Sequence, residues 1–336
     1  NLVRLDPALD ALIDPASPLE ILGEHFGLTE GPVWVKDAAG GYLLFSDCAA
    51  NVIYKWQPNA PLSVFLERSG FTGTNNLNAG QQTIAGRLAI LLIGSNGLAL
   101  DPQGRLIITA MADRTLVRLE KDGTRTTLAD RYDGKRLSGP NDVVVKSNGS
   151  IYFTDSVNGL RGGGDSPQRE LPYNGFYLLK DGKLTLLGGD RDRPGEFPNG
   201  IALSPDEKTL YVAEGDAKSA KRELRAYPVK DDGSVGPCKV LQVFGSDHQG
   251  PHRGIEGLCL DSDGNIVACA GAKGAGAGPM VYVISPQGAV LESHALPGDL
   301  PAKCAFGDSD LSSLYVTTGE GALYRAKSTG RRGIKR

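Results

Sequence analysis

A two-strand pattern recurs along the whole chain and limits the folds that it can adopt. Each copy has an apolar, partly alternating run, a polar turn containing Gly, Asp, Ser or Pro, and a second run rich in Leu, Ile, Tyr and Val. This order of signals is typical of a β-hairpin. The copies are TEGPVWVKDAAGGYLLFSD (29–47), SNGLALDPQGRLIITAM (95–111), GPNDVVVKSNGSIYFTDS (139–156), FPNGIALSPDEKTLYVAEG (197–215), GIEGLCLDSDGNIVACAG (254–271) and PAKCAFGDSDLSSLYVTTG (301–319). Further strand-like runs follow most of them, namely VIYKWQP (52–58), TLVRLEKDG (115–123), GFYLLKDG (175–182), ELRAYPV (223–229) and MVYVISPQG (280–288).

The spacing of the copies predicts the architecture. The polar residue that opens each first strand, which we call the anchor, recurs every 45 to 66 residues. Repeats of roughly 40–60 residues with about four strands each are typical of β-propeller blades, whereas helical repeats would show a period of 3.6 residues. Blades closed into a ring leave few exposed edges. We therefore predict an all-β fold, a six-bladed β-propeller with four-stranded antiparallel blades around a central channel, formed by one domain over residues 1–336.

Segments outside the repeats receive separate predictions. LEILGE (19–24) is predicted to be the outer strand of the last blade, which would fasten the two ends of the ring. Residues 1–17 are predicted to form an N-terminal arm, with DPALDALI (6–13) as a short helix or part of that arm. The Gly- and Asn-rich stretch 70–86 is predicted to be a surface insertion, and 327–336 a tail.

Composition excludes several classes of function. The net charge is −3, without any Lys/Arg-rich block, which argues against a nucleic-acid partner. No apolar run approaches the roughly 18 residues of a membrane span. Five cysteines without CxxC spacing argue against a disulfide framework or a zinc site. The chain begins Asn1-Leu2-Val3 without Met, so we favour a periplasmic or secreted protein, whose export signal has been removed, over a cytoplasmic one.

The anchors themselves are polar, although the strands that they open are apolar. Equivalent positions of successive blades lie on a circle around the propeller axis, so the anchors are expected to meet at one mouth of the channel. Carboxylate and amide oxygens suit Ca²⁺, and the absence of His and Cys argues against zinc or copper. A turn-opening role explains an Asn before Gly equally well, but explains the two glutamates poorly, because burying Glu without a partner is costly. The anchors are Glu30, Asn96, Asn141, Asn199, Glu256 and Lys303.

Three motifs resemble a known family. EGPVW around Glu30, GPNDVVV around Asn141 and PNGIALSPDE around Asn199 are similar to motifs of the senescence-marker-protein/gluconolactonase/luciferin-regenerating-enzyme-like family of six-bladed propeller lactonases. The resemblance covers nearly the whole chain. It implies a divalent-metal site, usually Ca²⁺, held by Glu30, Asn141 and Asn199, with a fourth ligand from the fifth motif. Other divalent ions, namely Mg²⁺, Mn²⁺, Zn²⁺ or Fe²⁺, remain open.

Two anchors depart from the family pattern. The fifth motif of the family typically reads Pro-Asp-Gly, whereas this chain has Ile255-Glu256-Gly257. Glutamate is one methylene longer, so Glu256 can still ligate, but the position or choice of metal can shift. A cation at Lys303 is the second departure. Three interpretations of Lys303 are open: it pairs with Glu30 or Glu256, it contacts substrate, or it points outward.

The predicted activity is hydrolysis of a sugar lactone such as an aldonolactone. A metal at the axis would polarise the carbonyl, and a carboxylate would assist the attack of water. Glu256, which lies where the family's acid is often assigned as base, is slightly favoured over Asp142, because neighbouring strand residues face opposite ways. Hydrolysis of organophosphates or other esters, and a non-catalytic propeller with a structural metal, are the alternatives. The substrate is expected to be a small lactone or ester.

Further residues are candidates for supporting roles. Asp47, Asp155 and Glu214 end second strands level with the anchors, so they either orient the ligands or cap the strands. Asn96 and Lys303 are candidate substrate contacts. His252, with His248 in the same loop, is a candidate proton shuttle. Finally, Arg161 belongs to the Gly-rich stretch 156–170, which is predicted to form a lid over the substrate.

Overall fold

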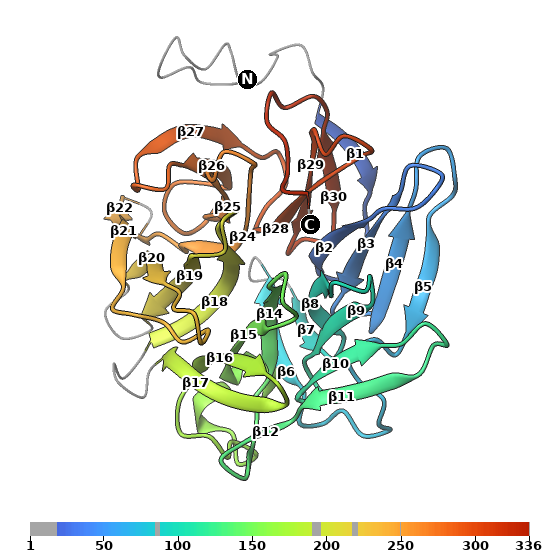
Figure 1. The fold of residues 1–336 in the computed structure, drawn as a ribbon, viewed down its shortest axis with the longest axis vertical. Coiled ribbons are helices and arrows are strands. Elements are labelled where there is room, and N and C mark those ends of the chain that lie inside the picture. Colours follow the sequence, from blue (N-terminus) through green and yellow to red (C-terminus); the bar gives the residue numbers. More distant parts are fainter. Residues whose placement is uncertain (1–18, 85–87, 190–195, 217–220, 249, 336) are drawn as a thin grey trace.

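In the computed structural model, residues 19–84, 88–189, 196–216, 221–248 and 250–335 are described. They form six four-stranded antiparallel sheets arranged as a ring (Figure 1). The six hairpins predicted from the repeat are the two inner strands of each blade, and the six-bladed β-propeller is confirmed. The expected arm at 1–17 and helix at 6–13 lie outside the described residues.

The blades follow one another along the chain. Blade 1 contains β2 (Thr29–Val35), β3 (Tyr42–Asp47), β4 (Val52–Trp56) and β5 (Ser63–Glu67). Blade 2 contains β8 (Ser95–Leu100), β9 (Leu106–Ala110), β10 (Thr115–Leu119) and β11 (Arg125–Ala129). Blade 3 contains β14 (Pro140–Val145), β15 (Ile151–Asp155), β16 (Gly175–Lys180) and β17 (Lys183–Gly189). Blade 4 contains β18 (Glu196–Leu203), β19 (Thr209–Asp216), β20 (Arg222–Pro228) and β21 (Lys239–Phe244). Blade 5 contains β24 (Ile255–Leu260), β25 (Ile266–Ala270), β26 (Met280–Ile284) and β27 (Val290–Ala295). Blade 6 contains β28 (Pro301–Gly307), β29 (Ser313–Thr318), β30 (Leu323–Ala326) and β1 (Leu19–Gly23).

The ring is closed at its rim and near its axis. β1 pairs antiparallel with β30 and completes blade 6, as the sequence predicted. Arg325 Nε donates to Glu20 Oε2 over 2.8 Å at this junction. Near the axis, Thr29 Oγ1 lies 2.9 Å from the carbonyl oxygen of Thr318 and 2.8 Å from that of Ala322. Blade 1 is therefore tied to blade 6 by the start of its inner strand as well as by the N-terminal strand.

Apolar side chains fill the spaces between neighbouring blades. Between blades 6 and 1, the rings of Trp34 and Tyr315 stack with centroids 5.6 Å apart. Within blade 3, Phe153 and Tyr177 stack at 5.4 Å, and both are fully buried. Each Å² of apolar surface that is buried contributes about 25 cal/mol, so these interfaces are the main source of stability. All five cysteines are free thiols, and no described helix is long and apolar enough to cross a bilayer.

Every inner strand contains a bulge near its anchor. In each inner hairpin the pairing register shifts so that the first strand has one residue more than its partner. In blade 3 the shift falls between Pro140 and Val143, and in blade 5 between Ile255 and Gly257. A bulge breaks the alternation of side chains and re-aims them, often beside active sites. The repeat pattern gave no signal for this feature.

The predicted insertion is an ordered hairpin. β6 (Gly80–Ile84) pairs with β7 (Leu88–Leu92), and Ala79 bridges to Leu160 in the loop that follows β15. Residues 85–87 of this hairpin lie outside the described part.

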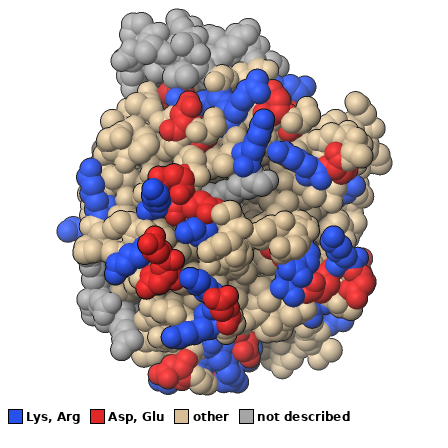
Figure 2. All heavy atoms as spheres, viewed as in Figure 1, with Lys and Arg blue, Asp and Glu red and all other residues tan. Residues whose placement is uncertain are grey.

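Seen from the face in Figure 2, Lys and Arg side chains are interspersed with Asp and Glu over the surface.

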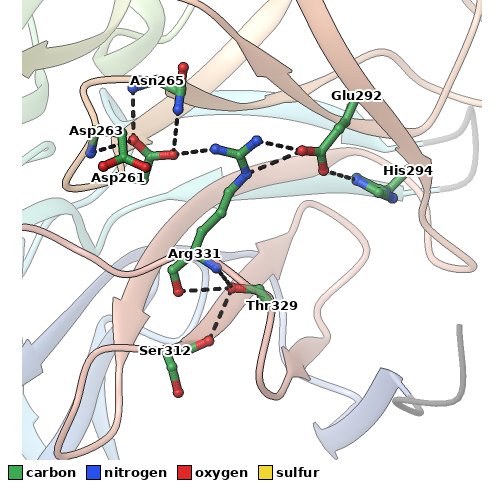
Figure 3. A network of polar contacts seen from close by, with 8 residues as sticks. All are labelled: Asp261, Asp263, Asn265, Glu292, His294, Ser312, Thr329 and Arg331. Atoms are coloured by element: carbon green, nitrogen blue, oxygen red, sulfur yellow. Dashed lines mark hydrogen bonds and ion pairs between the residues drawn. The ribbon is translucent and has the colours of Figure 1, made fainter. Parts of the chain in front are cut away.

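The segment predicted as a C-terminal tail packs against blades 5 and 6. Arg331 is 9% exposed and lies between two buried carboxylates, 2.5 Å from Asp261 Oδ2 and in a second ion pair with Glu292 (Figure 3). His294 Nε2 lies 2.8 Å from the other oxygen of Glu292. The backbone N–H of Ser262 donates to the carbonyl oxygen of Arg332 over 2.7 Å. This cluster, the Arg331 network, fastens the last residues of the chain to blade 5.

Replacing Arg331 by Met should destabilise the protein. The substitution removes the charge between two carboxylates that are each only 1% exposed, so we expect a loss of about 3 kcal/mol in the free energy of unfolding. Urea unfolding measures it. Arg332→Met is the matched control, because Arg332 is 63% exposed and its pair with Asp310 spans 3.6 Å, and it should change stability by no more than about 0.5 kcal/mol. Equal effects of the two substitutions would contradict the assignment.

The contribution of the Arg331 network should depend on pH. Burial acts to raise the pKa of Glu292, but hydrogen bonds from His294 and Arg331 outweigh it and hold the pKa below its ordinary value of 4.5. A carboxyl with a lowered pKa stabilises the fold above its unfolded-state pKa, and this stability is lost as the pH falls through the folded-state value. The stability difference between the wild type and Arg331→Met should therefore be full at pH 6 to 7 and shrink below about pH 4.5. Unfolding curves over this range measure it, and a difference that grew in acid would contradict the network.

Candidate active site

The inner strands pack side by side around the axis. β2, β8, β14, β18, β24 and β28 each contact the next in order, and β28 contacts β2. Their bulged ends lie at the same end of the hairpins, so the anchors gather at one mouth of the ring. We call this group of six anchors the hub.

Glycines allow the strands to approach closely at the hub. In four blades the residue after the anchor is Gly, and a Cβ atom there would collide with a carbonyl oxygen of the next blade. At Gly31 this atom would lie 2.0 Å from the oxygen of Asn96, and at Gly97 it would lie 2.9 Å from that of Asn141. The same holds, at 2.7 Å each, for Gly200 against Glu256 and for Gly257 against Ala302. The Gly after an anchor therefore allows two neighbouring inner strands to pack closely, because any side chain there would force the two blades apart.

Hydroxyl groups of the second strands satisfy the backbone at the bulges. Thr109 Oγ1 donates to the carbonyl oxygen of Asn141, and Thr154 Oγ1 to that of Asn199, both over 2.8 Å. Each bond crosses from one blade to the next. A bulge leaves its extra residue without a ladder partner, so these threonines replace the missing pairing. Sequence reasoning missed them, although a Thr four residues beyond the turn in both hairpins was a visible signal.

Glu30 is a buried carboxyl beside a second carboxylate. It is 6% exposed. Burial, together with the charge of Glu256, raises the pKa of Glu30 to about 8, although Lys303, Arg253 and the N–H of Gly31 act in the opposite direction. The charges of the two glutamates therefore repel one another.

The three anchor asparagines have free amides. Asn96 and Asn141 are 7% and 5% exposed, and Asn199 is partly exposed. Among the described residues, none of their side-chain amides makes a hydrogen bond within the protein. Their amide atoms are not fully enclosed, so these groups can donate hydrogen bonds to a ligand and accept hydrogen bonds from it.

Lys303 spans the hub and pairs with Asp142 of the opposite blade. The side chains are 9% and 4% exposed and form a buried ion pair. Asp142 also accepts hydrogen bonds from the backbone N–H groups of Val143 at 2.8 Å and Ile201 at 3.0 Å. Burial lowers the pKa of Lys303 to about 8, although the charge of Glu30 acts in the opposite direction.

This pairing differs from the expectations for Lys303. Among the described carboxylates its direct partner is Asp142 rather than Glu30 or Glu256, and an outward orientation is wrong because the residue is 7% exposed. The bulge between Pro140 and Val143 explains the difference, since Asp142 no longer follows simple strand alternation away from Asn141.

Glu256 lies within its bulge and is the more accessible of the two glutamates. Its side chain is 20% exposed, and Arg253 Nη2 lies 2.8 Å from Oε2. Arg253 was not predicted; its only sequence signal is its position three residues before an anchor.

The supporting carboxylates hold backbone rather than anchor side chains. Asp47 accepts from the N–H of Gly27 over 2.9 Å, and Asp155 accepts from Ser138 at 2.9 Å and Gly139 at 2.7 Å. Burial raises the pKa of Asp155 to about 6, against these bonds. These bonds position the residues that lead into β2 and β14, so they act on the hub through the backbone.

Glu214 instead lies in an ion pair. Its Oε2 is 2.7 Å from Arg225 Nη1, and Tyr227 donates its hydroxyl to Oε1 over 2.5 Å. Both partners belong to β20, the next strand of blade 4, so these contacts lie within the blade.

The remaining candidates, His252, His248 and Arg161, belong to loops outside the inner strands. His252 is 7% exposed, accepts from Gly254 N at Nδ1 over 2.8 Å and stacks on Phe244 at 4.8 Å, whereas His248 is exposed. Arg161 donates to Leu77 O over 3.3 Å, so the predicted lid loop is bound to the insertion hairpin segment. The roles of His252 and Arg161 towards a substrate stay predictions.

The hub as a whole offers oxygen ligands and a polarised interior. Among the described residues, no three His, Cys, Asp or Glu side chains gather as a metal-binding set. The hub instead combines two carboxylates with three asparagine amides, and amides are not among the residue types that define such a set. This arrangement can bind a cation or a polyhydroxylated molecule, and Glu256 can exchange a proton with it.

Comparison with known proteins agrees with this geometry. The family model described as "SMP-30/Gluconolactonase/LRE-like region" matches residues 28–320. The gluconolactonase of Zymomonas mobilis is 32% identical over 336 residues, covering 98% of this chain and 87% of that protein. A solved gluconolactonase from Xanthomonas campestris is 28% identical with a TM-score of 0.72, covering 96% of this chain and 93% of that one. A calcium-binding regucalcin from Agrobacterium tumefaciens, 19% identical with a TM-score of 0.65 over 95% of this chain and 96% of that one, shares the fold. The chain therefore belongs to the SMP-30/gluconolactonase/LRE-like family.

Proposed function

We propose that this protein is a lactonase that opens a sugar lactone, such as an aldonolactone, at the hub. The proposal is carried by the repulsion between the charges of Glu30 and Glu256 in a ring whose anchor asparagines make no side-chain hydrogen bonds among the described residues. The gluconolactonase relatives support the reaction class. Hydroxyl-rich substrates match amide groups, which can both donate and accept hydrogen bonds.

A divalent cation, with Ca²⁺ the first candidate, fits the residues of the hub. The predicted ligands are Glu30, Glu256, Asn141 and Asn199. The raised pKa of Glu30 supports this set, because a cation between the glutamates would relieve their repulsion and favour the carboxylate form. When bound, the cation would polarise the lactone carbonyl as a Lewis acid. The calcium-binding regucalcin with the same fold agrees with the choice of metal.

Glu256 is the better candidate for the general base. It is more exposed than Asp142, and its ion pair with Arg253 through Oε2 leaves Oε1 available to take a proton from water. Asp142 already accepts two backbone hydrogen bonds and pairs with Lys303, so its lone pairs are largely used. Lys303 then serves to neutralise Asp142 inside the ring, and Asn96 can donate its amide N–H to a substrate hydroxyl.

Removing Asn199 tests the metal site. Asn199→Ala should weaken Ca²⁺ binding at least about ten-fold, since loss even of a group behind the ligands costs ten- to a hundred-fold. Calorimetric titration of chelator-treated protein measures the affinity, and a panel of lactones measures hydrolysis with and without chelator. Asn148→Ala, in the exposed turn after β14, is the control and should behave as the wild type. Hydrolysis that survives complete chelation would refute the metal requirement.

Glu256→Gln tests the base. The amide keeps an oxygen for binding but cannot accept a proton, so kcat should fall by about 10² to 10⁴ while Ca²⁺ still binds. Exposed Glu24→Gln provides the control. Near-normal kcat in Glu256→Gln would move the role elsewhere. Turnover of phosphotriesters but of no lactone would favour the organophosphate alternative, and binding without any turnover would favour a non-catalytic propeller.

A further inference from the structure

A polar pocket lies beside the hub, between blades 2 and 3. It has a volume of about 220 Å³, and its lining includes Arg114, Arg136, Asn75, Asn78, Gln168 and Gly159. This space equals that of about seven liquid water molecules, so it can hold more than a single bridging water. The residues come from four segments: the stretch after β5, the turn after β9, the short strand β13 (Lys135–Arg136) that precedes β14, and the loop that follows β15.

We propose that this pocket is a subsite for an oxyanionic group, a phosphate or sulfonate, carried by the lactone at a distance from its ester. The inference rests on the proposed function and narrows its substrate class. A free inorganic oxyanion has the same chemistry, and the experiment below distinguishes the two sources.

Arg114 is the first observation. It is 5% exposed, and its Nε donates to Leu137 O over 2.5 Å, whereas its Nη2 has no hydrogen-bond partner among the described residues. Arg114 forms no ion pair with any described residue. Burial and the nearby Arg136 lower the pKa of Arg114, against the charges of Glu170 and Asp155, which attract it without forming an ion pair among the described residues. Its planar fork matches phosphate and sulfonate oxygens.

Arg136 is the second cation of the pocket. It is partly exposed and donates Nη2 to Asp113 O over 2.9 Å, again without an ion pair among the described residues. Two like charges in one pocket repel unless an anion lies between them. The pocket also contains the carboxylate of Asp113, but that group accepts hydrogen bonds from Thr72 N at 3.0 Å and Thr72 Oγ1 at 2.8 Å. Its charge is thus partly engaged by the loop that closes the pocket.

The pocket and the hub share a stretch of backbone. Gly159, in the pocket wall, packs so tightly on Gly139 that a Cβ at Gly139 would lie 2.5 Å from its Cα. Asn141 follows two residues later. Leu137, which Arg114 holds, is four residues from Asn141 and thus at most about 14 Å away. A sugar lactone with a terminal anionic group would have to span this separation to contact the anchors and the arginines together.

The amides of the pocket add to its fit. Asn75, Asn78 and Gln168 present groups that can donate hydrogen bonds to oxyanions or to sugar hydroxyls. A neutral apolar ligand would leave these amides and the arginines unpaired, so the lining selects against it.

The decisive experiment compares two δ-lactones that differ only in a terminal phosphate. For the Ca²⁺-loaded full chain, kcat/KM should be about ten- to a hundred-fold higher for the phosphorylated lactone, as expected for hydrogen bonds to a charged group. Arg136→Met should bring this ratio to about one, and Arg114→Lys, which keeps the charge but loses the fork, should reduce it. Arg118→Met, on the same blade but outside the pocket, is the charge-matched control and should leave the ratio unchanged.

Sulfate provides a readout that does not depend on turnover. Calorimetry should detect sulfate binding to the wild type and to Arg118→Met but not to Arg136→Met, and sulfate should inhibit the phosphorylated lactone competitively. Equal kcat/KM for the two lactones without sulfate binding would overturn the subsite and leave the lactonase proposal standing. Sulfate that binds without competing would overturn the substrate role. If sulfate binds in an Arg136-dependent way while no lactone is hydrolysed, the anion site is supported and the proposed function fails.

Discussion

The extra residue in each inner strand is the constraint on which the hub depends. A regular strand would send successive side chains to opposite sheet faces, into the interfaces with the neighbouring blades. The bulges interrupt that alternation at the mouth of the ring. Glycines such as Gly31 and Gly97 then let the next strand lie against the bulge, and hydroxyls such as Thr109 satisfy the displaced backbone. Convergence of the anchors follows from these three local devices together.

The electrostatics of the hub are unevenly compensated. Asp142 and Lys303 neutralise one another across the ring, and Arg253 accompanies Glu256 at its edge. Glu30 receives no comparable partner among the described side chains, and its pKa is raised accordingly. In the nearby pocket, Arg114 and Arg136 form no ion pair among the described residues, although Asp113 lines the same pocket and Glu170 accepts from the backbone N–H of Arg136.

The sequence predicted the fold well because the evidence for it is repeated. Six hairpins at similar spacing define the blades, and the apolar run at Leu19–Gly23 identified the closing strand. The partner of Lys303 could not be predicted, because it depends on the register shift beside Asp142 and on which blades face each other. Arg331 was equally hidden, since nothing in a short basic C-terminal stretch indicates burial between Asp261 and Glu292. Long-range pairs of charges depend on tertiary geometry, which hydrophobic patterns do not encode.

The pairing of β1 with β30 has a consequence for how the molecule is made. β1 comes before all the blades in chain order, yet it can complete its sheet only with β28 to β30, which come after the other five blades. Until then, the nascent chain carries an unfinished final blade and unpaired edges that could associate with other chains. Blades 1 to 5 can form in order as they emerge, but the circle of anchors is assembled only when translation of the final hairpin is over. Closure of the ring is thus coupled to synthesis of the sixth blade, and a chain that stops before β28 would lack the circle even with five of the anchors present.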